Sequence, residues 1–318
     1  MLLIGGVLHQ GTWLLENADN MPNKTITREY AGRAGIAFAA LAFVGLGACM
    51  ESAPPAPSGE TNTQIDPAMC PEAPKPHGHP WEYDGPEGQE HWGTTDGYAN
   101  CLNGKSQSPI DIEDPVTGDA ARSGLDDHAY ADAPGRFYDN GHTLMFLFPH
   151  EQPGGTLVLD GVTYTLEQFH FHAPSEHRIA GKAHPMEAHF VHSAPPVSPG
   201  RPPRRAVVAV LIDVGPEENA FLAPLFAHLP ETGSEGRCLQ TEGLAEVLLR
   251  DRGGFYRYDG SLTTPDCSEH VQWLIMEKPI LASAEQIGRF VSVFPDNARH
   301  VQPIDGRTIT FHPGEPAP

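Results

Sequence analysis

The stretch LEQFHFHAPSEH, Leu166–His177, places His170 and His172 two positions apart in a run that otherwise reads as a β-strand. Successive side chains of a strand point to opposite faces, so these histidines share one face, about 7 Å apart. Phe169 and Phe171 share the other face. Two imidazoles on one face can bind a single zinc ion. Because the chain has 17 histidines, the pair taken alone favours two polar residues on a solvated face.

A second strand-like run, MEAHFVH at Met186–His192, supplies a third histidine. Turn residues separate the two runs, so the simplest arrangement is a pair of neighbouring antiparallel strands. His189 then lies opposite the face that carries His170 and His172. Three histidines with an open fourth position are typical of a catalytic zinc site, whereas structural sites use four protein ligands, commonly cysteines. The sequence has no C-x-x-C pair. We therefore expect a catalytic zinc site.

Two further histidines compete with His189 as the third ligand. His192 has the opposite strand parity, and His177 falls in the turn region, so both rank below His189. Metal-bound histidines usually donate their second ring N–H to a carboxylate, amide or carbonyl. Gln168 stands two residues before His170, and Glu187 stands two residues before His189. Each is predicted to hold one ligand ring, although a surface position on a half-solvated strand is the alternative for both.

Composition limits the classes of function. The chain has 318 residues with 39% hydrophobic content, enough for one domain with a sizeable core. Lys and Arg number 20 against 41 Asp and Glu, which gives a net charge of −21. Such a chain does not bind nucleic acid or an anionic membrane surface through its charge.

The N-terminal part reads as a signal segment over residues 1–49. Gly35–Ala48 is almost wholly apolar, follows basic residues, and is too short to span a membrane comfortably. Leu46–Cys49 fits a bacterial lipoprotein signal, in which Cys49 is lipidated and anchors the protein. Ordinary signal cleavage nearby is the alternative. Residues 1–20 fit neither scheme, which makes Met21 an alternative start.

We expect three further segments along the chain: a Pro-rich tether over 50–79, one domain over 80–313 and a tail over 314–318. Short runs of β-branched and aromatic residues, separated by Gly, Pro and Asp, fill the domain. Helical periodicity is scarce outside Thr241–Leu248 and Ser283–Phe294. The pattern predicts a sheet-dominated domain with a few short helices.

Several motifs occur together with the histidine runs: QSPIDI at Gln107–Ile112, NGH at Asn140–His142 and YDGSLTTPDCSE at Tyr258–Glu269. With Gln168–His192 they resemble, in order, the alpha-class carbonic anhydrases of bacterial exported type. The resemblance spans about Trp81 to about Phe311. It implies a mainly β (α+β) domain on a large twisted, mostly antiparallel sheet, with short peripheral helices and a central zinc cleft.

The same resemblance implies a zinc enzyme that interconverts carbon dioxide with bicarbonate and a proton through attack by a zinc-bound hydroxide. Its expected partners are carbon dioxide and bicarbonate, and a homodimer is compatible with it. Its expected location is exported, in the periplasm or the cell envelope, with an outer-membrane lipoprotein as one form. The alternative is an acatalytic cell-surface binding module on the same fold, as in relatives that lost zinc ligands.

The resemblance assigns roles around the reacting atoms. Thr263 accepts a hydrogen bond from the zinc-bound hydroxide and donates one to the buried carboxylate of Glu176. The alternatives are a turn hydroxyl for Thr263 and an exposed turn acid for Glu176. Thr264 lines the pocket beside bicarbonate. The remaining expected positions are the apolar substrate wall and the supporting hydrogen-bond network: Val191, Val207 and Leu262 for the wall, which are ordinary core residues on the alternative interpretation, and Tyr258 and Ser108 for the network.

A proton has to leave the site in each turnover, and histidine titrates in the right pH range. His142 matches the shuttle position of the family, and Tyr83 and Asn140 match residues that order the proton-carrying waters. Met145 departs from the pattern, since Asn or Gln often stands there, and this puts the water network in doubt. His184 replaces a more usual Tyr.

Cysteine use agrees with export. Apart from Cys49, four cysteines remain, and an exported protein permits disulfides. The sequence alone allows three pairings of the four. The resemblance joins Cys101 to Cys267, which clamps the loop that carries Thr263. Elimination then leaves Cys70 with Cys238.

Overall fold

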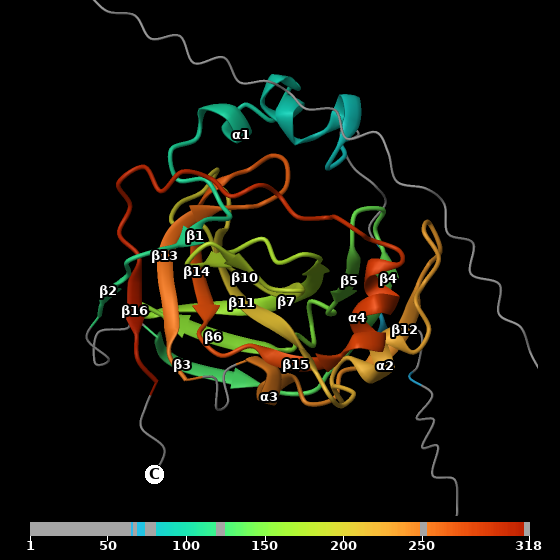
Figure 1. Cartoon of the computed structure of the whole chain (residues 1–318). Helices are drawn as coiled ribbons and strands as arrows, with labels where there is room; N and C mark the ends of the chain where they lie inside the picture. The colour runs from blue at the N-terminus through green and yellow to red at the C-terminus, as the bar shows by residue number, and fades with distance from the viewer. Residues whose placement is uncertain (1–64, 66–68, 74–80, 119–124, 249–252, 315–318) are drawn as a thin grey trace, which may run out of the picture. The chain divides into compact units, whose positions relative to one another are not determined.

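The β-branched and aromatic runs form the strands of one large sheet (Figure 1). The computed structural model describes residues 65, 69–73, 81–118, 125–248 and 253–314. The signal segment with Met21 and Cys49, and nearly all of the tether, lie outside these residues, so those assignments stay predictions. None of the described helices is long and apolar enough to cross a membrane.

The described strands are β1 Asp111–Ile112, β2 Val116–Thr117, β3 Leu125–Tyr130, β4 Pro134–Asp139, β5 Leu144–Leu147, β6 Gly155–Leu159, β7 Val162–His172, β8 Arg178–Ile179, β9 Lys182–Ala183, β10 Met186–Ala194, β11 Arg204–Gly215, β12 Arg237–Gln240, β13 Phe255–Ser261, β14 Glu269–Met276, β15 Ile280–Ser283 and β16 Thr310–His312. The described helices are the 3-10 helices Gly85–Glu87 and Gln89–Thr94 and the α-helices α1 Asn100–Asn103, α2 Ala223–Phe226, α3 Leu244–Leu248 and α4 Ala284–Val291.

Thirteen of the described strands pair into the large sheet, whose main path runs β12-β4-β5-β7-β10-β11-β14-β13-β16-β2. Its pairs are mostly antiparallel, as predicted. The parallel pairs are β11 with β14, β11 with β15, and β16 with β2. Strands β1, β8 and β9 form a second, small sheet. Figure 1 shows β7, β10 and β11 side by side in the middle of the large sheet.

Both faces of the central strands are buried, and alternation along β11 shows how. Val208 and Val210 belong to a cluster that also holds Phe169, Phe171 and Phe190. Their neighbours on β11, one residue away, belong to a second cluster on the other face with Trp273 and Tyr258. A strand covered on both faces needs apolar residues at nearly every position, which explains its almost continuous apolar sequence.

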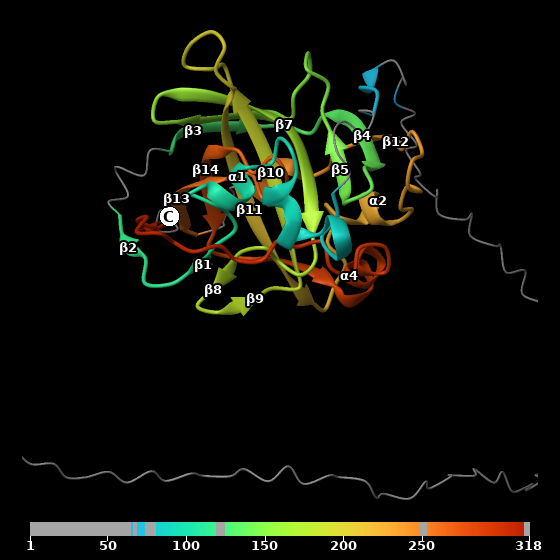
Figure 2. The ribbon, with the colours of Figure 1, turned by 90° about the horizontal axis from the view of Figure 1, so that it is seen from above.

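Helices α2 and α4 close the aromatic face of the sheet. Their contact includes Phe226 against Phe290, with ring centroids 5.9 Å apart, and the two helices lie together in Figure 2. Helix α4 begins with a capping box, in which the Ser283 hydroxyl accepts a hydrogen bond from the Gln286 backbone N–H. The short helix predicted from this segment is therefore present, and Ser283 is its N-cap.

Two disulfides join distant parts of the chain. Cys101 bonds to Cys267 and Cys70 bonds to Cys238, with Cα atoms 5.0 Å and 6.0 Å apart. Both distances lie in the usual range for a disulfide. Both pairings agree with those expected from the sequence.

Candidate metal centre

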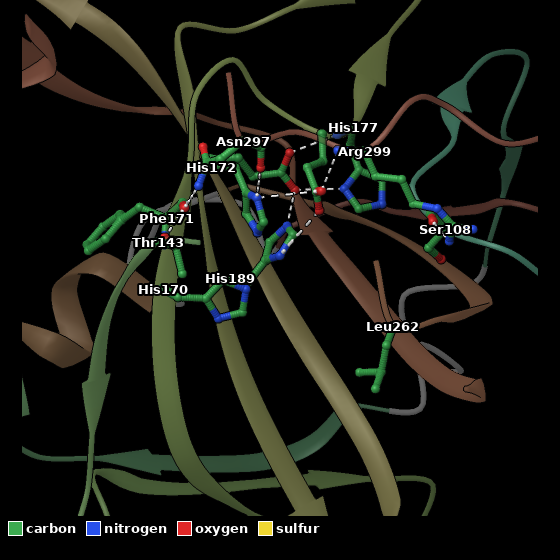
Figure 3. A network of polar contacts seen from close by, with 12 residues as sticks. Ser108, Thr143, His170, Phe171, His172, His177, His189, Leu262, Asn297 and Arg299 are labelled. Atoms are coloured by element: carbon green, nitrogen blue, oxygen red, sulfur yellow. Dashed lines mark hydrogen bonds and ion pairs between the residues drawn. The ribbon is translucent and has the colours of Figure 1, made fainter. Parts of the chain in front are cut away.

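The pairing of β7 with β10 brings the three predicted zinc ligands together. The strands are antiparallel neighbours, and His189 lies directly opposite His170 in the register. His172 shares the face of His170. One nitrogen from each of the three rings lies within 4.8 Å of the others (Figure 3). The strand alternation read from the sequence therefore produces a real convergence of imidazoles.

The opposite nitrogen of each ring has a hydrogen-bond acceptor, which fixes how the ring points. The three contacts are His170 Nδ1 to Gln168 Oε1 at 2.8 Å, His172 Nδ1 to the Asn297 carbonyl at 2.7 Å, and His189 Nε2 to Glu187 Oε1 at 2.7 Å. Because these oxygens accept, the ring nitrogens donate, and each remaining nitrogen carries a lone pair. His172 Nε2 is buried with no partner among the described atoms. An orphaned buried nitrogen of this kind fits a metal ligand.

Burial keeps these rings neutral, the form that binds a metal. It lowers the pKa of His172 to about 4. Burial, helped by the neighbouring rings of His172 and His189, holds the pKa of His170 well below its ordinary value. Burial also lowers the pKa of His189, although Glu187 opposes that shift. The trio is therefore uncharged at neutral pH.

Glu187 does more than hold one ring. His177 Nδ1 donates to Glu187 Oε1 at 2.7 Å, and the His177 backbone N–H donates to Oε2 at 2.8 Å. Burial alone raises the pKa of Glu187, but His177 and His189 outweigh it and hold this pKa well below its usual range. The carboxylate is thus charged and held from two sides.

The network continues outward from His177. The Tyr258 hydroxyl lies 2.7 Å from His177 Nε2, and Ser108 Oγ lies 2.8 Å from the same hydroxyl. Since His177 Nδ1 donates to Glu187, its Nε2 accepts from Tyr258 in the neutral ring. A continuous chain of hydrogen bonds therefore joins Ser108 to the His189 ring. Ser108 and Tyr258 therefore lie in the hydrogen-bond network next to the trio.

The sequence alone does not show that His177 supports the histidine trio. Its place in the sequence predicts a turn residue, but its side chain is wholly buried. His177, Glu187 and His189 also lie close enough to be considered as metal ligands. Their facing atoms are already joined by hydrogen bonds of 2.7 Å, so no ion fits between them. The competitor His192 is buried elsewhere, with its Nε2 2.9 Å from the Tyr130 hydroxyl.

Glu176 is buried beside the trio and is not an exposed turn acid; it is 1% exposed. Its Oε1 accepts from the Arg299 backbone N–H at 2.8 Å. Burial raises the pKa of Glu176 to about 7, opposed in part by His189, by the Arg299 N–H and by the Thr263 hydroxyl. Glu176 Oε2 is buried and has no hydrogen-bond partner among the described atoms.

A cleft of about 240 Å³ opens above the trio. One wall is polar and carries Tyr83, Asn140 and His142. An apolar wall carries Val191, Val207 and Leu262, together with Trp273. Thr263 and Thr264 also line it. Val191 and Val207 also belong to the apolar cluster behind the cleft, and Leu262 packs against it, so these residues line the cleft and contribute to the core.

His142 is held by Trp81 on the polar wall. The two rings stack with centroids 3.7 Å apart, and His142 Nε2 lies 2.7 Å from the Trp81 carbonyl. A carbonyl only accepts, so Nε2 carries the hydrogen of the neutral ring and Nδ1 keeps its lone pair. The ring is thus positioned with one nitrogen able to take up a proton.

The two departures from the family pattern have ordinary partners. Met145 lines the cleft opposite His170 in the register of β5 with β7, and its sulfur accepts from the Tyr138 hydroxyl at 3.1 Å. His184 Nδ1 lies 2.8 Å from Asp213 Oδ1. Met145 therefore puts an apolar side chain on the wall where an amide often stands.

Sequence reasoning missed three residues around the site. Asn297 accepts from His172 through its carbonyl, and its side chain also donates to the His142 and Phe171 carbonyls at 3.0 Å. Arg299 holds Glu176, and Trp81 holds His142. No local pattern marks these positions, because each acts on a residue at least 61 places away along the chain.

Comparison with known proteins places the chain among proteins of one kind. Residues 87–313 match the family model described as eukaryotic-type carbonic anhydrase. A carbonic anhydrase of Pectobacterium carotovorum is 37% identical over 231 residues, which cover 72% of this chain and 89% of that protein. A carbonic anhydrase of Klebsiella pneumoniae is 38% identical and also covers 72% of this chain and 89% of that protein. The solved alpha-carbonic anhydrase of Photobacterium profundum is 39% identical, with a TM-score of 0.63, covering 73% of this chain and all of the other.

Proposed function

Because this chain belongs to the eukaryotic-type carbonic anhydrase family, we propose that it binds one zinc ion through His170, His172 and His189 to interconvert carbon dioxide and bicarbonate. The observation that carries the zinc assignment is the convergence of three neutral rings whose outer nitrogens are all held. When bound, zinc supplies a Lewis acid that makes hydroxide available near neutral pH, an effect for which carbonic anhydrase is the standard example.

Other residues around the trio orient the attacking oxygen and form the surface for carbon dioxide. The Thr263 hydroxyl orients the attacking oxygen by accepting its hydrogen, while its own hydrogen is directed to Glu176. A divalent cation next to Glu176 favours the charged carboxylate, against the burial that raises its pKa. Carbon dioxide is small and apolar, so Val191, Val207 and Leu262 offer it a surface without competing hydrogen bonds.

The proton leaves along the polar wall, which carries His142. His142 Nδ1 takes it up, since Nε2 already donates to Trp81. Tyr83 and Asn140 order the waters between the reacting atoms and His142. Export to the periplasm or cell envelope, with Cys49 as a lipid-anchor candidate, completes the proposal, and mass spectrometry of the mature N-terminus tests that part.

A non-catalytic binding module is the competing function. Such a module needs neither the trio nor the residues that orient the nucleophile. Here His170, His172 and His189 stand beside Glu176 and Thr263, and all but the partly exposed His170 are buried. Retaining this whole set favours the enzyme.

Zinc content and carbon dioxide hydration, measured on the same preparations, test the proposal. The unaltered chain should hold one zinc ion and release protons when carbon dioxide is added. His189→Ala should lose both together, because two ligands bind zinc far more weakly than three. His192→Gln is the matched control, since it changes a buried histidine three places further along β10 that does not join the trio. Full zinc retention in His189→Ala, or an inactive zinc-loaded chain, contradicts the proposal.

A further inference from the structure

The mouth of the cleft carries one arginine that the reaction scheme above does not use. Arg205 begins the cleft-facing side of β11, two residues before Val207, and both side chains line the cleft. It is the only lysine or arginine among the described residues that line it. Its neighbour in the register is Ser193 on β10. The alternation of β11 therefore places a positive charge at the outer end of the apolar wall.

A β-bulge places an acid at the same mouth. Val191 pairs with Gln168, and His192 pairs with Leu166, so Glu167 is an extra residue on β7. Strict alternation would bury Glu167 and turn Leu166 to the cleft; the bulge reverses this. Leu166 is fully buried, and Glu167 lines the cleft.

Arg205 has no salt bridge or side-chain hydrogen bond with the described residues. Glu167, its natural partner at the mouth, instead accepts from the Ser193 hydroxyl. Arg204 differs in this respect, because its Nε donates to the Pro195 carbonyl at 3.0 Å. Arg205 is half-buried, and its guanidinium donors are available for a ligand in the cleft.

The position suits an anion that passes through the mouth. Ala209 lies opposite His189, and Arg205 is four residues before Ala209, about 13 Å along the strand. Arg205 is therefore too far to bind the metal but close enough to act on a charge in the cleft. A chain with a net charge of −21 repels anions in general, so one unpaired cation at the mouth matters more than usual.

We propose that Arg205 forms an anion-recruiting position at the mouth of the cleft, for small monovalent anions and bicarbonate above all. The identification of the anion as bicarbonate rests on the proposed function, whereas the existence of an anion-binding position at Arg205 does not. Carbon dioxide is neutral and is not attracted by Arg205. The overall equilibrium fixes the ratio of the two specificity constants, so Arg205 acts on how tightly bicarbonate binds and not on the direction of the reaction.

Calorimetric titration of the zinc-loaded chain with sodium thiocyanate, and with bicarbonate, at low ionic strength tests this position. Arg205→Gln should weaken binding of both anions about three- to tenfold, the size expected for one partly solvated charge. Arg205→Lys should keep most of the affinity. Glu167→Gln should shift the affinity in the opposite direction, because it removes a repelling charge. The differences should shrink at high salt.

Arg204→Gln is the matched control, because it makes the same charge change one residue away on the opposite face of β11. It should bind thiocyanate as the unaltered chain does. Equal affinity in Arg205→Gln and the unaltered chain overturns the position, and so does an equal loss in Arg204→Gln and Arg205→Gln. Zinc content of each variant is measured alongside. A chain that binds zinc and anions as expected but does not hydrate carbon dioxide would refute the proposed function and leave the anion position standing.

Discussion

Each of the three proposed ligand histidines is oriented by the ring nitrogen that faces away from the proposed metal site. Gln168, Asn297 and Glu187 each take one N–H, and the lone pair that is left then points at the common centre. A histidine without such a partner would sample both tautomers and several ring orientations. The orientation of the three rings is therefore set by these hydrogen-bond acceptors.

In the proposed function, Thr263 takes part in catalysis but not in metal binding. Thr263→Ala should keep full zinc content but lower carbon dioxide hydration about a hundredfold, because the hydroxyl orients the nucleophile without binding the metal. Stopped-flow hydration with parallel metal analysis measures both. Thr263→Ser keeps the hydroxyl and should recover most of the rate. A hydration rate unchanged in Thr263→Ala would end this role.

His142 is the second residue whose part can be isolated. His142→Ala should slow turnover about tenfold or more in dilute buffer, because no imidazole then carries the proton away. Concentrated buffer or added imidazole should restore much of the rate, and isotope exchange at chemical equilibrium should stay nearly unchanged. His150→Ala, which removes an exposed histidine that does not line the cleft, is the control. Equal rates in dilute and concentrated buffer would show that protons leave by another route.

At the scale of elements, β7 and β10 together make the site, and their two faces have opposite demands. One face presents histidines to the cleft, and the other packs Phe169 and Phe190 into the aromatic cluster. The bulge at Glu167 keeps a carboxylate out of that cluster where the alternation would otherwise bury it. His192 is a polar residue on the core side of β10, and it is fully buried.

His192 makes stability depend on pH. Burial lowers the pKa of His192 from 6.5 to about 4, although hydrogen bonds to the Phe190 and Ala206 carbonyls oppose this. The unfolded chain therefore gains a proton between pH 6.5 and about 4 that the folded chain does not. His192 does not lower the free energy of unfolding above pH 6.5. This free energy falls by up to about 3 kcal/mol as the pH decreases to about 4.

His192→Gln should remove this part of the acid sensitivity. Urea unfolding at pH 7 and near pH 4.5 measures the free energy lost on acidification, which should be smaller in the variant than in the unaltered chain. His150→Gln should leave the loss unchanged, since that histidine is exposed. An identical loss in the unaltered chain and His192→Gln would show that other groups cause the acid sensitivity.

At the scale of the whole molecule, distant segments meet at the site. Arg299 donates to the Ser108 carbonyl at 2.7 Å and to Gln107 Oε1 at 3.0 Å, while its backbone N–H holds Glu176. The Cys101–Cys267 disulfide joins the same region to the loop that follows Thr263. The C-terminal part of the chain therefore closes over strands that come much earlier in the sequence.

The two disulfides allow a test of this closure. Replacing Cys101 and Cys267 by Ser should lower stability by about 2–5 kcal/mol and also lower hydration activity, because the loop that carries Thr263 loses its clamp. Replacing Cys70 and Cys238 removes a bond of similar span, 168 against 166 residues, away from the site. That control should lose stability but keep activity in the folded protein. Thermal unfolding and hydration assays of both variants decide the matter, and equal activity losses would contradict a specific clamp.

Sequence alone determined the features that depend on local periodicity. Strand alternation put His170 and His172 on one face and Phe169 and Phe171 on the other, and the structure has both. The helix predicted within Ser283–Phe294, which spans Ala284–Val291 in the structure, and the sheet-dominated fold follow from the same kind of pattern. These succeed because side-chain direction in a strand or helix is set within a few residues.

Only the tertiary structure decided which distant groups hold the site. Asn297 reaches His172 across 125 positions, and His177 turns inward because Glu187 and Tyr258 offer partners that a turn on the surface lacks. The stacking of Trp81 on His142 and the bulge at Glu167 belong to the same class. Such contacts depend on packing between segments, and a hydrogen bond between two residues leaves no periodic trace in the sequence of either.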